Sequence, residues 1–119
     1  MDYSQLSDFE INRMVGDVIF KGLWACKPET SGNDTSKWYY GNADSTFEPL
    51  NPLPDYCNDW EAAGPIITGN KINIEWHEWK GGEFKPYALN YATMKSCYDE
   101  NPLRAAMIVF LMMQDAKHA

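Results

Sequence analysis

The sequence is poor in positive charge. Ten lysines and arginines stand against 17 aspartates and glutamates, which gives a formal net charge of −7 at pH 7. Proteins that grip nucleic-acid backbones or anionic membranes without sequence specificity do so through clustered Lys and Arg side chains. We therefore expect no direct binding of nucleic acid and no association with a membrane surface. The acidity would suit contact with a basic protein surface, and it suits an ordinary solvated surface equally well.

Cysteines and long apolar runs are also scarce. Cys26, Cys57 and Cys97 lie far apart, without a C-x-x-C pair, which predicts free thiols and neither a disulfide framework nor a zinc site. No apolar segment follows a basic N-terminus, and the apolar stretch at 105–113 is too short to cross a bilayer. We expect a cytosolic protein.

Signatures of common enzymes are absent from the sequence. It contains no P-loop, no dinucleotide-binding glycine fingerprint, no HExxH and no nucleophile elbow. His77, flanked by Glu75 and Glu78, is the one plausible general base or metal ligand. On a strand, however, Glu75 and His77 would share the face opposite Trp76, as on any solvated face. We expect no catalytic residue, no metal and no cofactor.

What the sequence does have is a well-specified helix near its C-terminal end. Asn101 can cap the first turn, and Pro102 at the first helical position suits the helix by its fixed φ. The residues that follow, up to Gln114, are apolar nearly all the way round. Such a helix must be covered on more than one side, by the rest of the domain or by a neighbouring subunit.

Two further helices are indicated earlier in the chain. The capping box Ser7-Asp8-Phe9-Glu10 opens an amphipathic helix that ends somewhere between Gly16 and Gly22, although residues 18–20 could instead start a strand towards Trp24. A short central helix starts at Asn58 or Asp59, with the side chains of Trp60, Ala63, Ile66 and Ile67 on one face. We expect Gly64-Pro65 to kink or end it.

A β-hairpin is predicted between the central and last helices. Ile72, Ile74 and Trp76 alternate with polar residues, which indicates a strand with one buried face. Gly81-Gly82 marks the turn, and a returning strand lies within 83–92, where Pro86 suggests an edge position or a bulge. With an N-terminal helix, a short central helix and a buried C-terminal helix, the order predicts an α+β fold, a sandwich with a small antiparallel sheet.

The whole chain, residues 1–119, is expected to form a single domain with a long loop or insertion at about 27–57. That segment is rich in Gly, Asn, Asp, Ser, Thr and Pro, and only residues 37–40 have strand-like, aromatic character. Long loops in compact domains are usually functional or mobile. Trp38, Tyr39 and Tyr40 therefore belong either to a binding loop or to a short strand packed on the core.

Several blocks of the sequence carry a family resemblance: residues 2–4 (DYS) with 7–12 (SDFEIN), 58–67 (NDWEAAGPII) and 101–106 (NPLRAA). By these blocks the chain resembles the NinX-like proteins of tailed bacteriophages. The last two also resemble a broader phage α-β-α sandwich domain, in which a D-W motif opens one helix and a P-L-x-x-A motif opens the last. The resemblance implies a small phage accessory protein in the host cytoplasm, with no known catalytic residues. Such proteins commonly grip a host protein or capture a defence signal molecule.

The aromatic content favours a non-enzymatic binder. Stacking a base on an aromatic side chain contributes about 1–3 kcal/mol, so two stacking contacts with a guanidinium on a phosphate would give micromolar binding. Arg104 lies in the first turn of the last helix, where backbone N–H groups favour an anion; the alternative is an ion pair with Asp99 or Glu100. The leading hypothesis is sequestration of a nucleotide-like anion as a counter-defence function. Its expected site residues are Trp38, Tyr39, Tyr40, Trp76, Trp79 and Arg104.

Two other interpretations stay open. The chain could be an acidic inhibitor that blocks a basic surface of a host protein by mimicking nucleic acid, with a stripe formed by Asp2, Asp8, Glu10, Asp17, Asp44, Glu48, Asp55, Asp59 and Glu61. Alternatively, the aromatic and methionine side chains line the interface of a homo-oligomer, since both types are enriched at interfaces. An oligomer and a ligand site can coexist, and a homo-oligomer is expected.

Overall fold

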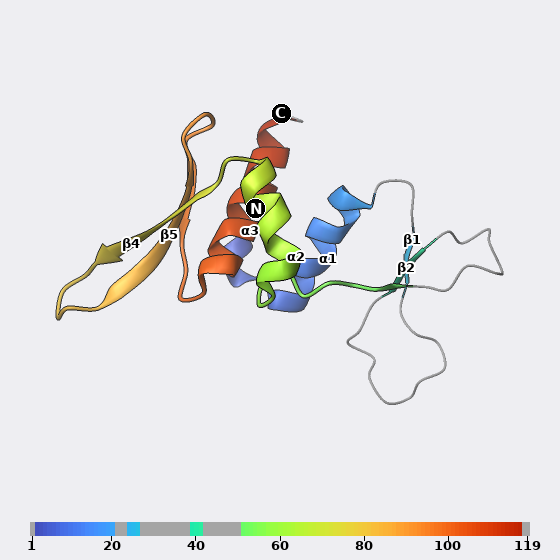
Figure 1. Ribbon diagram of the computed structural model, residues 1–119, viewed down its shortest axis with the longest axis horizontal. Helices are drawn as coiled ribbons and strands as arrows, with labels where there is room; N and C mark the ends of the chain where they lie inside the picture. Colours follow the sequence, from blue (N-terminus) through green and yellow to red (C-terminus); the bar gives the residue numbers. More distant parts are fainter. Residues whose placement is uncertain (1, 21–23, 27–38, 42–50, 118–119) are drawn as a thin grey trace.

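The computed structural model describes residues 2–20, 24–26, 39–41 and 51–117 (Figure 1). Within these ranges the fold is α+β, as predicted, and the chain forms three α-helices and two small antiparallel sheets. Their bounds, in chain order, are a 3₁₀ turn at Tyr3–Gln5, α1 Asp8–Ile19, β1 Trp24–Cys26, β2 Tyr39–Gly41, β3 Asn51–Pro52, α2 Trp60–Gly69, β4 Asn73–Glu78, β5 Phe84–Asn90, β6 Lys95–Tyr98 and α3 Pro102–Lys117.

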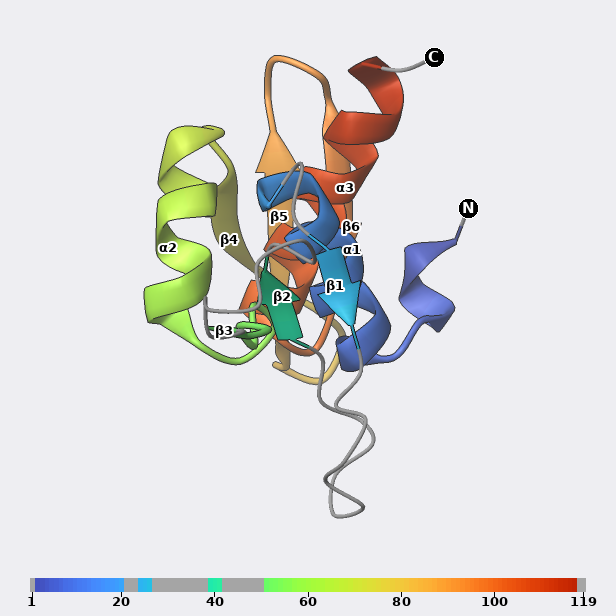
Figure 2. The ribbon, with the colours of Figure 1, turned by 90° about the vertical axis from the view of Figure 1, so that its right-hand side faces the viewer.

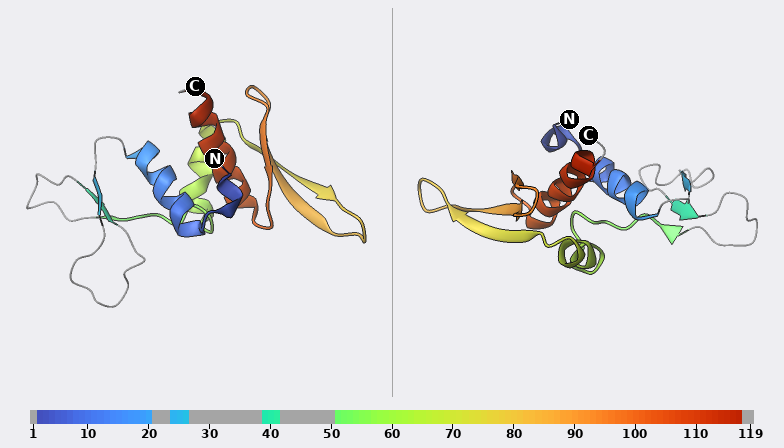
Figure 3. Two further views of the ribbon diagram at one scale, coloured as in Figure 1. Left: turned by 180° about the vertical axis from the view of Figure 1, so that it is seen from behind. Right: turned by 90° about the horizontal axis from the view of Figure 1, so that it is seen from above.

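Helix α3 lies at the centre of the molecule. The β4–β5–β6 sheet packs on one side of it, and α1 and α2 pack against it from other sides (Figure 3). This explains why the helix is apolar nearly all round: every residue from Ala105 to Leu111 is buried. The predicted cap is confirmed, since Asn101 Oδ1 accepts hydrogen bonds from the backbone N–H groups of Leu103 (2.9 Å) and Arg104 (3.3 Å).

The capping box of α1 is confirmed as well. Ser7 Oγ accepts from the Glu10 backbone N–H (3.1 Å), and Glu10 Oε1 accepts from the Ser7 N–H (3.4 Å). The helix ends at Ile19, and the residues near Trp24 form the separate strand β1. At Gly16 an added Cβ would lie 2.6 Å from Leu53 Cδ1, so α1 approaches the 53–57 segment closely at this point.

Of the two outcomes expected for Gly64-Pro65, a kink or an end of the central helix, the second is wrong. Asp59 caps α2 by accepting from the Glu61 N–H (3.0 Å), and the helix runs through Pro65 to Gly69. Pro65 has no N–H to donate to the Glu61 carbonyl one turn earlier, and the helix continues without that bond. Ala63 and Ile66 are buried as predicted, whereas Trp60 is 58% exposed and does not belong to the core.

The predicted hairpin is present, and β6 adds a third strand that was not anticipated. Residues Gly81 and Gly82 adopt φ of 88° and 83°, a left-handed conformation that favours glycine, in the turn between β4 and β5. Because β5 pairs with both neighbours, Pro86 lies in a central strand rather than at an edge. Its carbonyl accepts from the Asp99 N–H just past the end of β6 (3.3 Å). Its nitrogen faces that same side, so the proline removes no bond of the β4–β5 ladder.

The β4–β5 hairpin extends beyond the helices, as Figures 1 and 3 show. The alternating pattern is therefore only partly buried. Ile72 and Ile74 pack into or against the core, but Trp76 is 58% exposed and Phe84 59% exposed, because both lie on the part of the hairpin that no described helix covers.

The second sheet contains β1, β2 and β3 and lies at the opposite end of the molecule from the β4–β5–β6 sheet, as Figure 1 shows; Figure 2 views the molecule from the end that carries it. Tyr39 and Tyr40 are in β2, opposite Cys26 and Ala25 of β1, so the backbone follows the short-strand alternative. Trp38 and most of the 27–57 segment lie outside the described residues. No described helix is long and apolar enough to span a membrane.

Candidate functional site

Arg104 is held by protein groups. Its Nη1 donates to Asp8 Oδ1 (2.8 Å) and its Nε to Asp99 Oδ2 (3.0 Å). Its Nη2 donates to the carbonyls of Leu6 (2.6 Å) and Ser4 (3.2 Å), and the side chain is only 12% exposed. Burial by itself would lower the pKa of Arg104, but the hydrogen bonds to the two carboxylates outweigh it and raise that pKa. The alternative of an ion pair with Asp99 is confirmed.

Asparagine side chains extend this network to the starts of all three helices. Asn101 Nδ2 donates to the Cys57 carbonyl (2.6 Å) and to Asn58 Oδ1 (3.0 Å). The buried Asn12 donates to Asp55 Oδ1 (2.9 Å) and accepts from the Cys57 N–H (3.0 Å). The blocks that carry the family resemblance, at 7–12, 58–67 and 101–106, thus meet in one place. We call this set of residues the helix-start network, and its evident role is to join the helices.

The carboxylates expected to form an acidic stripe have local structural roles at several positions. Asp2 accepts from the Ser4 N–H (3.1 Å) at the 3₁₀ turn, while Glu10 and Asp59 complete helix caps. Asp8 and Asp55 belong to the helix-start network, where Asn58 Nδ2 donates to both. Asp44 and Glu48 lie outside the described residues. These five carboxylates therefore serve helix starts.

A second cluster lies on the face of the β4–β5–β6 sheet that points away from α3. Glu75 and His77 on β4 are opposite Tyr87 and Lys85 on β5, and Tyr87 is opposite Tyr98 on β6. Residues directly opposite in antiparallel strands share a face, so these five side chains lie together. We call this surface the open face; it also includes Trp79 at the end of β4 and Tyr91 after β5.

Polar contacts link four side chains of the open face. His77 Nε2 lies 2.9 Å from Glu75 Oε1, and Tyr91 Oη donates to Glu75 Oε2 (2.8 Å). These two hydrogen bonds lower the pKa of Glu75. In the tautomer that carries its proton on Nε2 and donates it to Glu75, Nδ1 is the acceptor for the Tyr98 hydroxyl, which lies 2.5 Å away. We call these four hydrogen-bonded side chains the His77 relay. A histidine held by a carboxylate resembles a general base, but the side chains of His77 and Glu75 are 35% and 38% exposed to solvent.

Aromatic rings cover the rest of the open face. The rings of Tyr87 and Tyr98 are 4.3 Å apart between centroids, His77 lies 4.6 Å from Tyr87, and Trp79 meets Tyr98 edge to face at 5.3 Å. Lys85 Nζ lies 4.6 Å over the Trp79 ring and 3.3 Å from Glu100. Trp79 and Tyr98 remain 45% and 42% exposed.

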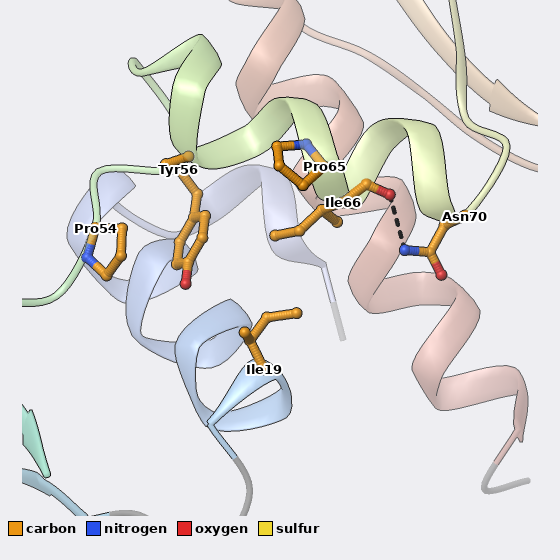
Figure 4. A pocket seen from close by; sticks show the side chains of 7 residues that line it. Ile19, Pro54, Tyr56, Pro65, Ile66 and Asn70 are labelled. Carbon is orange, nitrogen blue, oxygen red and sulfur yellow. Dashed lines mark hydrogen bonds between the residues drawn. The ribbon is translucent and has the colours of Figure 1, made fainter.

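An apolar groove of about 350 Å³ lies elsewhere, between α1 and α2 (Figure 4). It contains none of the residues predicted as site residues and no charged side chain. Asn70, its one amide, donates Nδ2 to the Ile66 carbonyl (2.8 Å). Its lining is Ile19, Pro54, Tyr56, Ala62, Pro65, Ile66 and Asn70.

The structure distributes the predicted site residues over separate places. Trp79 lies on the open face, Trp76 on the opposite face of the same hairpin, and Arg104 in the helix-start network. Tyr39 and Tyr40 are in β2, at the other end of the molecule. Trp38 lies outside the described residues. Among the described residues, no group of three or more His, Cys, Asp or Glu side chains is placed to hold a metal ion.

Sequence reasoning missed Tyr87 and Tyr98 as partners of His77. The period-2 pattern of β4 put Glu75 and His77 on one face, and continuing it into the return strand would have placed Tyr87 beside them. Tyr98 could be found only by recognising β6, which carries no strong strand pattern.

Comparison with known proteins gives one family. The family model for NinX of bacteriophage P22 matches residues 2–114 of this chain. No curated protein matched the sequence, and no solved structure matched the fold. The matched region includes the helix-start network and the whole open face, and it covers nearly the full length. The chain therefore belongs to the NinX family of bacteriophage proteins.

Proposed function

We propose that this NinX-family protein is a non-enzymatic phage accessory protein that binds a host protein through the open face of its β4–β5–β6 sheet. Family membership makes it a phage accessory protein. The observation that carries the proposal is the packed set of aromatic rings at His77, Tyr87, Tyr98 and Trp79, which stays accessible on a hairpin that extends beyond the helices.

The composition of the open face supports a protein partner. Trp and Tyr are enriched at protein interfaces and supply most of the binding energy where they cluster centrally. Here they are already ordered by contacts with one another, so binding would immobilise few side chains. Lys85 and Glu75 add one charge of each sign, which suits a partner of mixed charge better than the acidic mimicry of nucleic acid.

The nucleotide-like ligand expected from the sequence becomes the second candidate. Its expected phosphate-binding group, Arg104, already donates to two carboxylates and two carbonyls. What still favours it is the aromatic platform, because a base can stack on the open rings near Lys85 at about 1–3 kcal/mol per contact. Sequestration of a host defence signal would then use the open face and not Arg104.

Catalysis is not part of the proposal. An oriented Glu75–His77 pair can act as a general base only when a substrate is held next to it. His77 Nδ1 is occupied by Tyr98, and the pair lies on an accessible face. We assign the hydrogen bonds of the His77 relay a structural role, in which they hold the aromatic rings of the open face in place.

Native mass spectrometry of the tagged protein from host cells tests the proposal, with Trp79→Ala and Tyr98→Ala as variants and Trp60→Ala as the matched control. Trp60 is 58% exposed, but it lies on α2, away from the open face. The proposal predicts one stoichiometric host protein that is retained by the wild type and Trp60→Ala and lost from both open-face variants. Loss from Trp60→Ala alone, or equal retention by all forms, would contradict it. A small molecule of nucleotide mass instead of a protein would select the second candidate.

A further inference from the structure

We infer that the free edge of β4 is a self-association surface, on which β4 of a second copy of this chain pairs antiparallel with Trp76 opposite the partner's Trp76. The inference does not rest on the proposed function, because it uses the backbone of the strand edge and not a host protein. It joins two open faces into one larger surface.

Strand β4 is an edge strand of its sheet, and no other described strand pairs with its outer side. The alternation of the ladder shows which groups are unpaired there. The Trp79 N–H donates to the Glu83 carbonyl (2.6 Å), so the backbone groups of Trp79 point towards β5. In an antiparallel ladder every second residue repeats this direction, so the backbone N–H and C=O groups of His77 and Glu75 also point towards β5. The N–H and C=O groups of Ile74, Trp76 and Glu78 therefore point outward.

Apart from the carboxylates of Glu75 and Glu78, this edge lacks the features that usually prevent strand addition. Residues 73–78 contain no proline, glycine or lysine, and the six-residue strand has an unbroken register with β5. The other edge of the sheet, β6, has only four residues and begins with Lys95. Unpaired backbone groups on an unprotected strand form a template for another strand.

Charge selects the register and the occupant. In a new antiparallel pair, residues whose backbone N–H and C=O groups point outward must lie opposite one another to form hydrogen bonds. Two registers near the middle of β4 satisfy this condition, one centred on Glu75 and one centred on Trp76. The first puts Glu75 opposite the partner's Glu75, and like charges directly opposite are unfavourable. The second puts Glu75 opposite the partner's His77, and His77 opposite the partner's Glu75. The strand is thus complementary to itself.

The same register covers the exposed tryptophan. Trp76 is 58% exposed and is the central residue of the pairing, so it meets the partner's Trp76 on the helix side of the joined sheet. Aromatic cross-strand pairs are among the most favourable in antiparallel sheets. On the open side, each Glu75 then lies beside two imidazoles, its own His77 at 2.9 Å and the partner's.

A proline at an outward position tests the edge directly. Glu78→Pro removes an outward N–H and leaves the β4–β5 ladder intact, while Ser96→Pro removes an outward N–H from the opposite edge, on β6. Native mass spectrometry over a dilution series from about 100 µM should show a dimer for the wild type. We expect Glu78→Pro to weaken it about tenfold or more, since two hydrogen bonds are lost per dimer, and Ser96→Pro to leave it unchanged. A monomeric wild type, or equal effects of both prolines, would overturn the inference.

Disulfide trapping tests the register and does not depend on the proline variants folding. Glu75→Cys and His77→Cys chains are mixed and oxidised, with the wild-type chain showing the background from its native thiols. The register centred on Trp76 predicts a mixed 75–77 disulfide between the two chains. A product dominated by 75–75 disulfides, or no dimer above background, would contradict it.

Discussion

Arg104 Nη1 donates to Asp8 Oδ1 at 2.8 Å, across 96 positions of sequence. The contact joins the first turn of α3 to the first turn of α1. Through Nε the same guanidinium holds Asp99, which directly follows β6, so one side chain links both helices to the sheet. Arg104 is therefore a structural residue. The helix-start network joins the helices, whereas the proposed binding role belongs to the open face.

Arg104→Ala should destabilise the protein. The substitution removes four hydrogen bonds and leaves Asp99, whose side chain is 16% exposed, without its charged partner. We expect a loss of about 3 kcal/mol in the free energy of unfolding, since removing one member of a largely buried ion pair costs roughly that much. Urea titration followed by circular dichroism measures it. From the sequence alone, Arg104 is instead expected among the ligand-binding residues, a role in which its loss would affect ligand capture and not stability.

Lys85→Ala is the matched control for that measurement. Lys85 pairs with Glu100, whose side chain is 82% exposed, and such surface pairs contribute about 0–1 kcal/mol. If the two variants unfold at the same urea concentration, the structural role of Arg104 is disproved.

Two substitutions at Asn101 separate its capping from its bridging role. Asn101→Ala removes both the cap and the bonds from Nδ2 to Cys57 and Asn58, whereas Asn101→Ser keeps a capping oxygen. We expect the alanine variant to lose about 2 kcal/mol and the serine variant about 1 kcal/mol of the free energy of unfolding. Thermal unfolding of the two variants side by side gives the comparison, and equal stability of both would show that the cap contributes nothing.

The free energy of unfolding should fall at alkaline pH because of Tyr3. Burial, a hydrogen bond from Tyr3 to Asp115 and the charge of Asp115 raise the pKa of Tyr3 to about 12. Below pH 10, tyrosine is neutral in both the folded and the unfolded chain, so its contribution is fully present. Between about pH 10 and 12 only the unfolded chain ionises, and stability falls by up to about 2 kcal/mol as pH rises. Tyr3→Phe should fall less steeply over this range, and parallel curves would refute the assignment.

The two described thiols should react slowly and in a fixed order. Burial raises the pKa of Cys57 to about 12 and that of Cys97 to about 11, so both are protonated near neutral pH. Cys57 is fully buried, whereas Cys97 is partly accessible. In a Cys26→Ser background, a disulfide reagent should modify Cys97 first and Cys57 only on unfolding. Faster reaction of Cys57 would mean that the 53–57 segment opens in the native state.

The sequence was most informative where structure is specified locally. The caps at Ser7, Asp59 and Asn101 each depend on a side chain within three residues of the group it satisfies, so the starts of all three helices could be predicted. The return strand followed from its turn glycines. Strand β6 was missed because it follows a turn with neither glycine nor proline, in which Met94 takes a left-handed φ of 58°.

Contacts between distant segments could not be predicted. Asp99 is five positions from Arg104 and was anticipated as its partner, but Asp8 and the Ser4 and Leu6 carbonyls reach it only through the tertiary fold. Trp60 fits a buried helical face by spacing, yet it lies in the first turn of α2, where more than half of its surface stays exposed. The predicted site residues were chosen by their aromatic or cationic character alone, which carries no information on tertiary contacts, and the structure places the described ones in separate parts of the fold.

Site-specific photo-crosslinking in host cells tests the central claim most directly. A photoreactive phenylalanine analogue is placed at Trp79 on the open face or at Trp60 on α2, both exposed tryptophan positions. The account predicts one covalent adduct of defined mass from position 79, absent from position 60 and lost when Tyr98→Ala is added. Adducts of equal yield from both positions, or from position 60 alone, would contradict the assignment of the open face as the binding surface.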